Sequence, residues 1–308
     1  MSDATEDATV FFSDGVAVGS DALVVGAGFT GAPEAATSRI YLKLGDTWLS
    51  HEVAHDFITS VAHQHGVICA LGRNGLVKQV GEWGRELTPG RVRGRFREYV
   101  ITDAEERGPL ERVRAIGGAF IACGWGGQVY RLRAGTWSRM EPGLDPEREN
   151  DFMDLDGFAS DDLYAVGLDG VAAHFDGTRW RYLELPTSAH LHSVRCLPGG
   201  EVVVAGAEGV LLQGNRSGWR RLKAGALQED LWAVCPFGGK LFLASGERGL
   251  HAYYRGTCAE VEVAGGVRPQ PHRLDASGDV LWAIGSRSLM SFDGKQWVEA
   301  LCPDNAPG

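Results

Sequence analysis

The chain has 308 residues, of which 44% are hydrophobic, and its 40 acidic and 30 basic side chains give a formal charge of −10. This length can bury a sizeable core, whereas the acidic balance argues against a nucleic-acid surface, which needs clustered positive charge. The polar, acidic N-terminus and the lack of 18 consecutive uncharged apolar residues predict neither a signal peptide nor a membrane span.

A short phrase recurs seven times from the N-terminus to the C-terminus. An apolar run ends in glycine, a short turn and a second run follow, and a further run opens at tryptophan; residues 163–180 read LYAVGLDGVAAHFDGTRW. A period near 40 with short apolar runs and Gly-rich turns is typical of a β-propeller. The turn glycines are Gly26, Gly72, Gly124, Gly167, Gly206, Gly246 and Gly285, and the opening residues are Trp48, Trp83, Trp137, Trp180, Trp219, Cys258 and Trp297.

Each repeat divides into four strands, which in the fifth repeat we place at residues 190–196, 201–205, 210–213 and 219–222. We therefore predict an all-β fold, a seven-bladed β-propeller of four-stranded antiparallel blades. Repeats from about residue 10 to residue 302 predict one domain over residues 1–308. Two insertions interrupt the period. We expect residues 27–38 to expand a turn between the second and third strands, and residues 84–110 to expand the connection from the second blade to the third.

The recurring phrase also carries a family resemblance. AVGLDG followed by FDGTRW, and AIGSRS followed by FDGKQW, resemble bacterial propellers of the BNR, YVTN and WD-repeat-like group. The resemblance covers nearly the whole chain and implies the fold. Because that group includes sensors, scaffolds, lectins, hydrolases and assembly factors, it implies no particular activity.

Residues 51–55 spell HEVAH, which matches the zinc-peptidase pattern H-E-x-x-H. That pattern works on a helix, whereas the repeat places it on a fourth strand, where the two histidines would lie about 13 Å apart. The pairs His63/His65 and His190/His192 have no acidic or cysteine companion at ligand spacing. We therefore predict no metal and no cofactor.

The six cysteines include no C-x-x-C pair and fall mostly inside expected strands. Buried free cysteine behaves as a small hydrophobe, and a reducing compartment keeps it unpaired. We therefore expect a cytoplasmic protein.

The expected turns between second and third strands carry varied, charged residues, which suit a protein partner. The insertion at residues 84–110 adds four alternating arginines, and Trp125 lies in a turn where no other repeat has an aromatic residue. Alternatives are that the arginines form a solvated strand face and that Trp125 packs beneath the insertion. The predicted partner-binding residues are Phe29, Arg73, Asn74, Arg91, Arg93, Arg95, Phe96, Arg97, Trp125, Asp169, Glu208, Glu247, Arg248 and Arg287.

We therefore predict a monomeric, non-enzymatic, protein-binding propeller, most specifically an inhibitor or immunity protein that caps a bacterial toxin or enzyme through its loops. An acidic, rigid body suits the blocking of a basic active site. One alternative is a carbohydrate-active or lyase-type enzyme using Asp151, Asp154, His192 and Arg195 at the channel mouth. A further alternative is an assembly scaffold.

Overall fold

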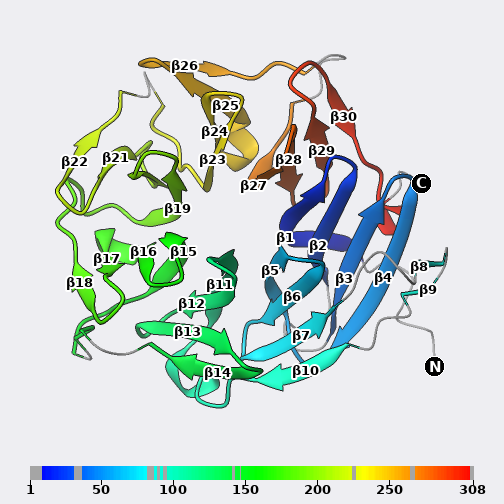
Figure 1. The fold of residues 1–308 in the computed structure, drawn as a ribbon. Helices are drawn as coiled ribbons and strands as arrows, with labels where there is room; N and C mark the ends of the chain where they lie inside the picture. The colour runs from blue at the N-terminus through cyan, green and yellow to red at the C-terminus, as the bar shows by residue number, and fades with distance from the viewer. Residues whose placement is uncertain are drawn as a thin grey trace.

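The computed structural model contains seven four-stranded antiparallel sheets, arranged as blades around a central channel (Figure 1). The predicted seven-bladed β-propeller is therefore confirmed. The short 3-10 helices of the described residues are η1 (Glu105–Arg107), η2 (Leu168–Gly170), η3 (Gly246–Arg248) and η4 (Pro303–Asn305). The structure describes residues 9–30, 37–81, 87–88, 91–92, 96–140, 143–145, 147–223, 227–263 and 268–305.

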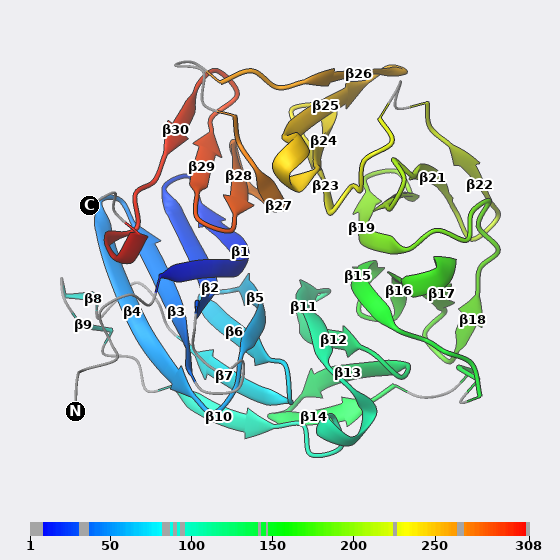
Figure 2. The same ribbon diagram turned by 180° about the vertical axis from the view of Figure 1, so that it is seen from behind.

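The first strand of each blade lines the channel, and the second strand lies directly outside it (Figure 2). The first strands are β1 (Val10–Gly19), β5 (Ile58–Gln64), β11 (Leu110–Ile116), β15 (Phe152–Ala159), β19 (Leu191–Leu197), β23 (Ala233–Phe237) and β27 (Pro271–Ser277). The second strands are β2 (Ala22–Phe29), β6 (Val67–Gly72), β12 (Ala119–Gly124), β16 (Asp162–Gly167), β20 (Glu201–Gly206), β24 (Lys240–Ala244) and β28 (Val280–Gly285).

The third and fourth strands complete each blade toward its outer edge. The third strands are β3 (Thr37–Leu44), β7 (Leu76–Val80), β13 (Gln128–Arg133), β17 (Ala172–Phe175), β21 (Leu211–Asn215), β25 (Leu250–Tyr254) and β29 (Leu289–Phe292). The fourth strands are β4 (Thr47–Ala54), β10 (Arg97–Val100), β14 (Thr136–Arg139), β18 (Trp180–Tyr182), β22 (Gly218–Arg221), β26 (Thr257–Glu260) and β30 (Trp297–Glu299).

Burial follows the position of a strand in its blade. In β20 every residue after Glu201 is buried, because neighbouring blades cover both faces of the second strand. In the outer strand β22 no residue is fully buried, and its two arginines are exposed. Charged side chains on such an edge disfavour pairing with another sheet.

The up-and-down order of strands gives the ring two different faces. The connection face carries the turns between second and third strands and the chain segments between blades. The hairpin face carries the hairpins that join first to second and third to fourth strands. Loops on the same face come from all seven blades, so residues distant in sequence are gathered there.

The second blade departs from the predicted register. Its fourth strand is β10, which pairs with β7 through Arg97↔Gln79 and Val100↔Leu76. The prediction that residues 84–110 form one connection between blades is therefore wrong, because this segment contains the outer strand itself. Trp83, the predicted opening residue, lies outside the described residues. The first insertion was predicted at residues 27–38. β2 extends through Phe29 and β3 begins at Thr37, and residues 31–36 between these strands are outside the described residues.

Each described opening residue of a fourth strand packs toward the preceding blade. Trp180 of blade 4 is 1% exposed, belongs to an apolar cluster with Ile121 and Val129 of blade 3, and donates its indole N–H to the Met140 carbonyl at 2.9 Å. Trp219 packs in the same way on blade 4 and Trp48 on blade 7. The repeated tryptophan thus supplies the apolar area that holds neighbouring blades together.

Among the described residues the ring closes without sharing a strand, because the first blade consists of β1–β4 and the last of β27–β30. Side chains and backbone groups bridge the seam between them. The Phe12 amide donates to the Ser286 carbonyl at 2.8 Å, and Asp304 accepts from Tyr41 at 2.6 Å and from Arg39 at 2.5 Å. Closure therefore combines apolar packing with these bonds.

We predict that Trp180→Ala lowers the free energy of unfolding by about 3–5 kcal/mol, because it opens a cavity between two blades and removes the bond to Met140. Trp297→Ala, at the same register of the last blade but only half-buried, is the comparison and should cost less. Urea unfolding followed by tryptophan fluorescence and circular dichroism measures both. Equal losses for the two variants would contradict the assignment of Trp180 to a buried interface.

Candidate partner-binding face

Charged side chains from five of the innermost strands fill the channel, and we call them the charged plug. Asp14 and Arg112, from blades 1 and 3, form an ion pair of 2.8 Å that crosses blade 2, where the Ser60 hydroxyl donates to the same carboxylate. Asp154 is completely buried and lies 2.8 Å from Arg114. The plug consists of Asp14, Arg112, Arg114, Asp154, Asp156, Arg195, Arg273 and Asp275.

Burial and pairing shift the acidity of the plug in opposite directions. Burial favours the neutral form of Asp14, but the Arg112 and Arg273 guanidinium groups hold its pKa below the usual value. Burial raises the pKa of Asp275 to about 6, against the opposing charge of Arg114. The plug is therefore a paired network that carries buried charge at a cost.

The enzyme alternative is not supported by the channel mouth. The cavity among the plug residues measures about 30 Å³, which suits water and not a sugar. Asp154 and Arg195 are engaged in the plug, and the Asp151 carboxylate accepts the Gly126 amide at 2.9 Å. His192 stacks instead on Trp232, with ring centroids 4.4 Å apart. Asp154 and Arg195 thus lie 3.6 Å apart within the plug, whereas Asp151 and His192 make their contacts elsewhere.

The H-E-x-x-H motif lies on a strand, as predicted. His51 and Glu52 belong to β4, and His55 follows it with a left-handed φ of 70°. The His51 ring stacks on Phe96 at 3.8 Å, and burial lowers its pKa. Within the described residues, no group of three or more His, Cys, Asp or Glu side chains is arranged to hold a metal.

Most of the predicted partner-binding residues do lie on the connection face. They occupy the turns between second and third strands in six blades, or the end of β2 in the case of Phe29, where the Arg39 guanidinium covers its ring at 4.9 Å. Asp169 and Glu208 adopt left-handed backbone conformations within their turns, with φ of 52° and 56°. The residues on this face are Phe29, Arg73, Asn74, Trp125, Asp169, Glu208, Glu247, Arg248 and Arg287.

The described arginines of the second insertion, Arg91 and Arg97, lie in strands and not in the turns of the connection face. Arg91 belongs to the separate two-stranded sheet of β8 (Leu87–Thr88) and β9 (Arg91–Val92), whereas Arg97 opens β10. Phe96 contacts β4 at the outer rim. Arg93 and Arg95 lie outside the described residues. Arg91 and Arg97 therefore lie in different strands.

Trp125 combines the two roles that its turn suggested. Its amide donates to the Pro109 carbonyl at 3.0 Å, and its side chain hydrogen-bonds to Glu111. The backbone of Gly108 lies so close that an added Cβ would be 3.1 Å from the Trp125 Cβ. One side of the residue is therefore supported by the preceding connection, while 36% of its surface stays exposed.

A second tryptophan on this face escaped the sequence analysis. Trp232 directly precedes β23, is 37% exposed and rests on the His192 ring. Its position in the repeat matches that of His192, one residue after a buried leucine, and not that of the blade-end tryptophans. A tryptophan outside the register of the blade-end tryptophans could therefore have been recognised from the sequence as a candidate binding residue. Trp125 and Trp232 stand on blades 3 and 6, on opposite sides of the ring (Figure 1).

Between these tryptophans the connection face is strongly acidic. Among their described residues, the turns and connections from η1 to η3 present ten exposed carboxylates but only four exposed basic side chains, Arg107, Arg148, Lys223 and Arg248. We call the carboxylates the acidic arc. They are Glu105, Glu106, Asp145, Glu147, Glu149, Asp169, Glu184, Glu208, Asp230 and Glu247.

Comparison with known proteins identifies the family. The chain is 33% identical over 215 residues to the immune protein Tsi7 of Pseudomonas aeruginosa, and the match covers 67% of this chain and 70% of that protein. The chain belongs to the Tsi7 immune-protein family. This agrees with the predicted immunity protein. No protein-family model matches the chain.

Solved structures place this Tsi7-family member among known propellers. The propeller of YCF48 bound to D1 peptide has a TM-score of 0.69 at 14% identity and covers 96% of this chain and 94% of that chain. The WD40 β-propeller domain of Doa1 has a TM-score of 0.65 at 11% identity and covers 96% and 93%. At these identities the likeness concerns the fold alone. No helix in the described part of the chain is long and apolar enough to cross a membrane.

We predict that Asp275→Asn stabilises this protein more at neutral pH than at pH 4.5. The native carboxyl keeps its proton up to about pH 6, whereas the unfolded one loses it near pH 4, so Asp275 lowers the free energy of unfolding as pH rises between these values. A shift of two pKa units corresponds to about 3 kcal/mol. The asparagine oxygen still accepts the bond that the Ala17 amide donates to Asp275.

Urea unfolding at pH 4.5 and 7.5 measures this difference. Asp279→Asn, on the exposed hairpin of the same blade, is the matched control and should change the free energy equally at both pH values. If Asp275→Asn changes the free energy of unfolding by the same amount at both pH values, burial does not raise the pKa of the Asp275 carboxyl.

Proposed function

We propose that the protein is a non-enzymatic immunity protein that neutralises a toxin by binding it through the connection face. Membership of the Tsi7 family carries this proposal, since the relative is named an immune protein. The acidic arc and the exposed tryptophans support the choice of face. Such a protein needs affinity and rigidity but no chemistry of its own.

The charge of the face indicates the chemistry of the partner. Ten carboxylates along an arc attract a basic surface, and complementary charge raises the association rate. A toxin with a basic active-site cleft presents such a surface. Covering that cleft would exclude its substrate.

Trp125 and Trp232 are suited to anchor the complex. Tryptophan supplies a large contact area at small entropic cost and is enriched among interface residues with large effects. Each indole is held from one side, by Gly108 or by His192, and offers its remaining surface to solvent. Preorganised anchors of this kind lose little freedom on binding.

The free thiols support a cytoplasmic setting. All six cysteines are free, and four of them are fully buried. Unpaired cysteines persist in a reducing compartment, so we place the protein in the cytoplasm, as a monomer that meets its toxin there. The proposed partner is thus a protein of the same bacterium.

We predict that Trp125→Ala and Trp232→Ala each weaken binding of the toxin by about 10- to 100-fold, as loss of an aromatic anchor costs about 2 kcal/mol. The tagged full chain captures its partner from the native host for identification by mass spectrometry. Dissociation constants by biolayer interferometry and rescue of growth on toxin co-expression then measure each variant. Phe158→Ala, which removes an exposed aromatic residue from the hairpin face, is the control and should bind normally.

We also predict that the double reversal Glu105→Lys with Glu106→Lys slows association by about tenfold at low salt, with a smaller effect at high salt, because it weakens steering by the acidic arc. The control pair Asp46→Lys with Asp279→Lys changes the net charge equally but lies on hairpin-face turns. Equal slowing by both pairs would show that net charge alone acts. A toxin bound normally by all connection-face variants would overturn the proposed face.

A further inference from the structure

The sixth blade breaks the pattern of tryptophans at the start of the fourth strand. Its residue is Cys258, which pairs with Tyr253 in the register where Trp180 pairs with Phe175 and Trp297 with Phe292. Cys258 packs on the apolar cluster between blades 5 and 6, as the tryptophans pack between other blades. A cysteine fills much less of this space than an indole does.

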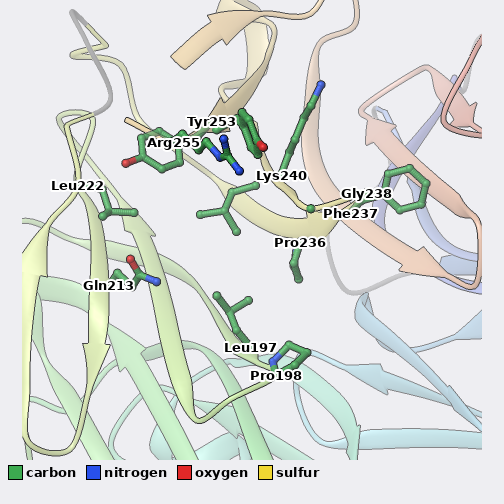
Figure 3. A pocket seen from close by; sticks show the side chains of 13 residues that line it. Leu197, Pro198, Gln213, Leu222, Pro236, Phe237, Gly238, Lys240, Tyr253 and Arg255 are labelled. Carbon is green, nitrogen blue, oxygen red and sulfur yellow. The ribbon is translucent and has the colours of Figure 1, made fainter. Parts of the chain in front are cut away.

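A pocket of about 590 Å³ opens at the same interface (Figure 3). Its floor is apolar: Leu222 is buried, and Leu197, Leu241 and Tyr253 are half-buried members of the cluster that contains Cys258. Figure 3 shows Leu197 and Pro198 along one side and Tyr253 and Arg255 along the other. This volume lies within the range of ligand sites, about 300–1,000 Å³.

The rim of the pocket is positively charged, although the chain as a whole carries −10. Lys240 and Arg255 line it, and none of its described lining residues carries a carboxylate. Within the described residues neither cation forms an ion pair, and the Arg255 guanidinium lies over the Tyr254 ring at 5.0 Å. The site therefore combines an apolar floor, which includes Tyr253, with two cations that have no acidic partner among the described residues.

The rim is also open. Gly238, Gly239, Lys240 and Arg255 are exposed, and nothing lies within 4 Å of a Cβ added at either glycine. A small ligand normally buries 70–90% of its surface, which an open rim does not provide. An extended peptide that inserts one side chain and leaves its backbone over the glycines fits this shape.

We propose that this pocket binds an extended segment of a partner protein, which inserts an aromatic side chain beside Tyr253 and places an adjacent carboxylate against Lys240 and Arg255. The inserted ring would pack on Tyr253, whose strand partner Cys258 stands where other blades carry tryptophan. The pocket is built from hairpin-face turns, so this second site leaves the connection face free and does not depend on the proposed toxin complex.

The test uses three short capped peptides with the ¹⁵N-labelled full chain. Their sequences are acetyl-Gly-Trp-Glu-Gly-amide, the same peptide with glutamine for glutamate, and the same peptide with alanine for tryptophan. We expect saturable shifts of the Gly238, Gly239 and Tyr253 amide signals. The dissociation constant should be about tenfold lower for the Trp-Glu peptide than for the other two, which corresponds to about 1.4 kcal/mol for the ion pair or the aromatic contact that each of them lacks.

Two variants assign the effect to the pocket. Lys240→Glu with Arg255→Glu should abolish the preference for glutamate over glutamine, and Cys258→Trp should fill the site from within and remove binding. If Cys258→Trp does not fold, the variant Lys240→Glu with Arg255→Glu, whose changes are exposed, still tests the proposal. The matched control, Arg133→Glu with Lys295→Glu, changes the same charge on hairpin-face turns of blades 3 and 7 and should bind as the native chain does.

The opposite results are equally clear. Absence of shifts at millimolar peptide, shifts elsewhere on the chain, or an equal loss in the control pair would overturn the proposal. Toxin binding measured on the same variants separates the two sites. If pocket variants still bind the toxin but no longer bind the peptide, the two surfaces act independently. If the native chain binds the peptide but no toxin, the proposed function is wrong and the pocket proposal stands.

Discussion

Burial of each blade against its two neighbours is the constraint on which this molecule depends. A single four-stranded sheet has two apolar faces, and only the adjacent blades cover them. The tryptophan at the start of a fourth strand reinforces this contact, as Trp180 does by reaching the Met140 carbonyl of the preceding blade. The same requirement shapes the seam, where Tyr41, Arg39 and Asp304 join the first blade to the residues after the last. Where the tryptophan is replaced by Cys258, a pocket appears between the blades.

In a closed ring of this kind, the sheets provide the stable structure and the turns between strands form the exposed faces. The sheets hold turns from different blades at fixed positions, so Trp125 and Trp232, more than a hundred residues apart in sequence, present their surfaces on one face. Carboxylates from intervening connections complete that face without any of them lying in a strand. An immunity protein benefits from this arrangement, because the loops can be adapted to a partner while the interior stays unchanged.

The repeat made the blades predictable, because glycine-rich turns and buried second strands are local features. The outer strand of the second blade was missed, since the insertion moved it to β10 and no tryptophan marks it. For the site, the turns identified most of the face, but the acidic arc required knowledge of which connections are exposed. The pair Asp14 and Arg112 was beyond sequence reasoning for a different reason: it joins strands that are neighbours only once the ring has closed. Cys258 was visible as an exception to the pattern, yet its consequence, a pocket, depends on packing in three dimensions.

The charged plug has an effect beyond the channel. Its four carboxylates face four guanidinium groups, so its formal charges cancel and the −10 of the chain resides on the remaining residues. The electrostatic field around the protein therefore comes from the outer surface, because a charge-balanced cluster produces little field at a distance. Stability and long-range attraction are thus assigned to different residues. Substitutions can change the charge of the outer surface to match a different partner without altering the paired charges of the plug.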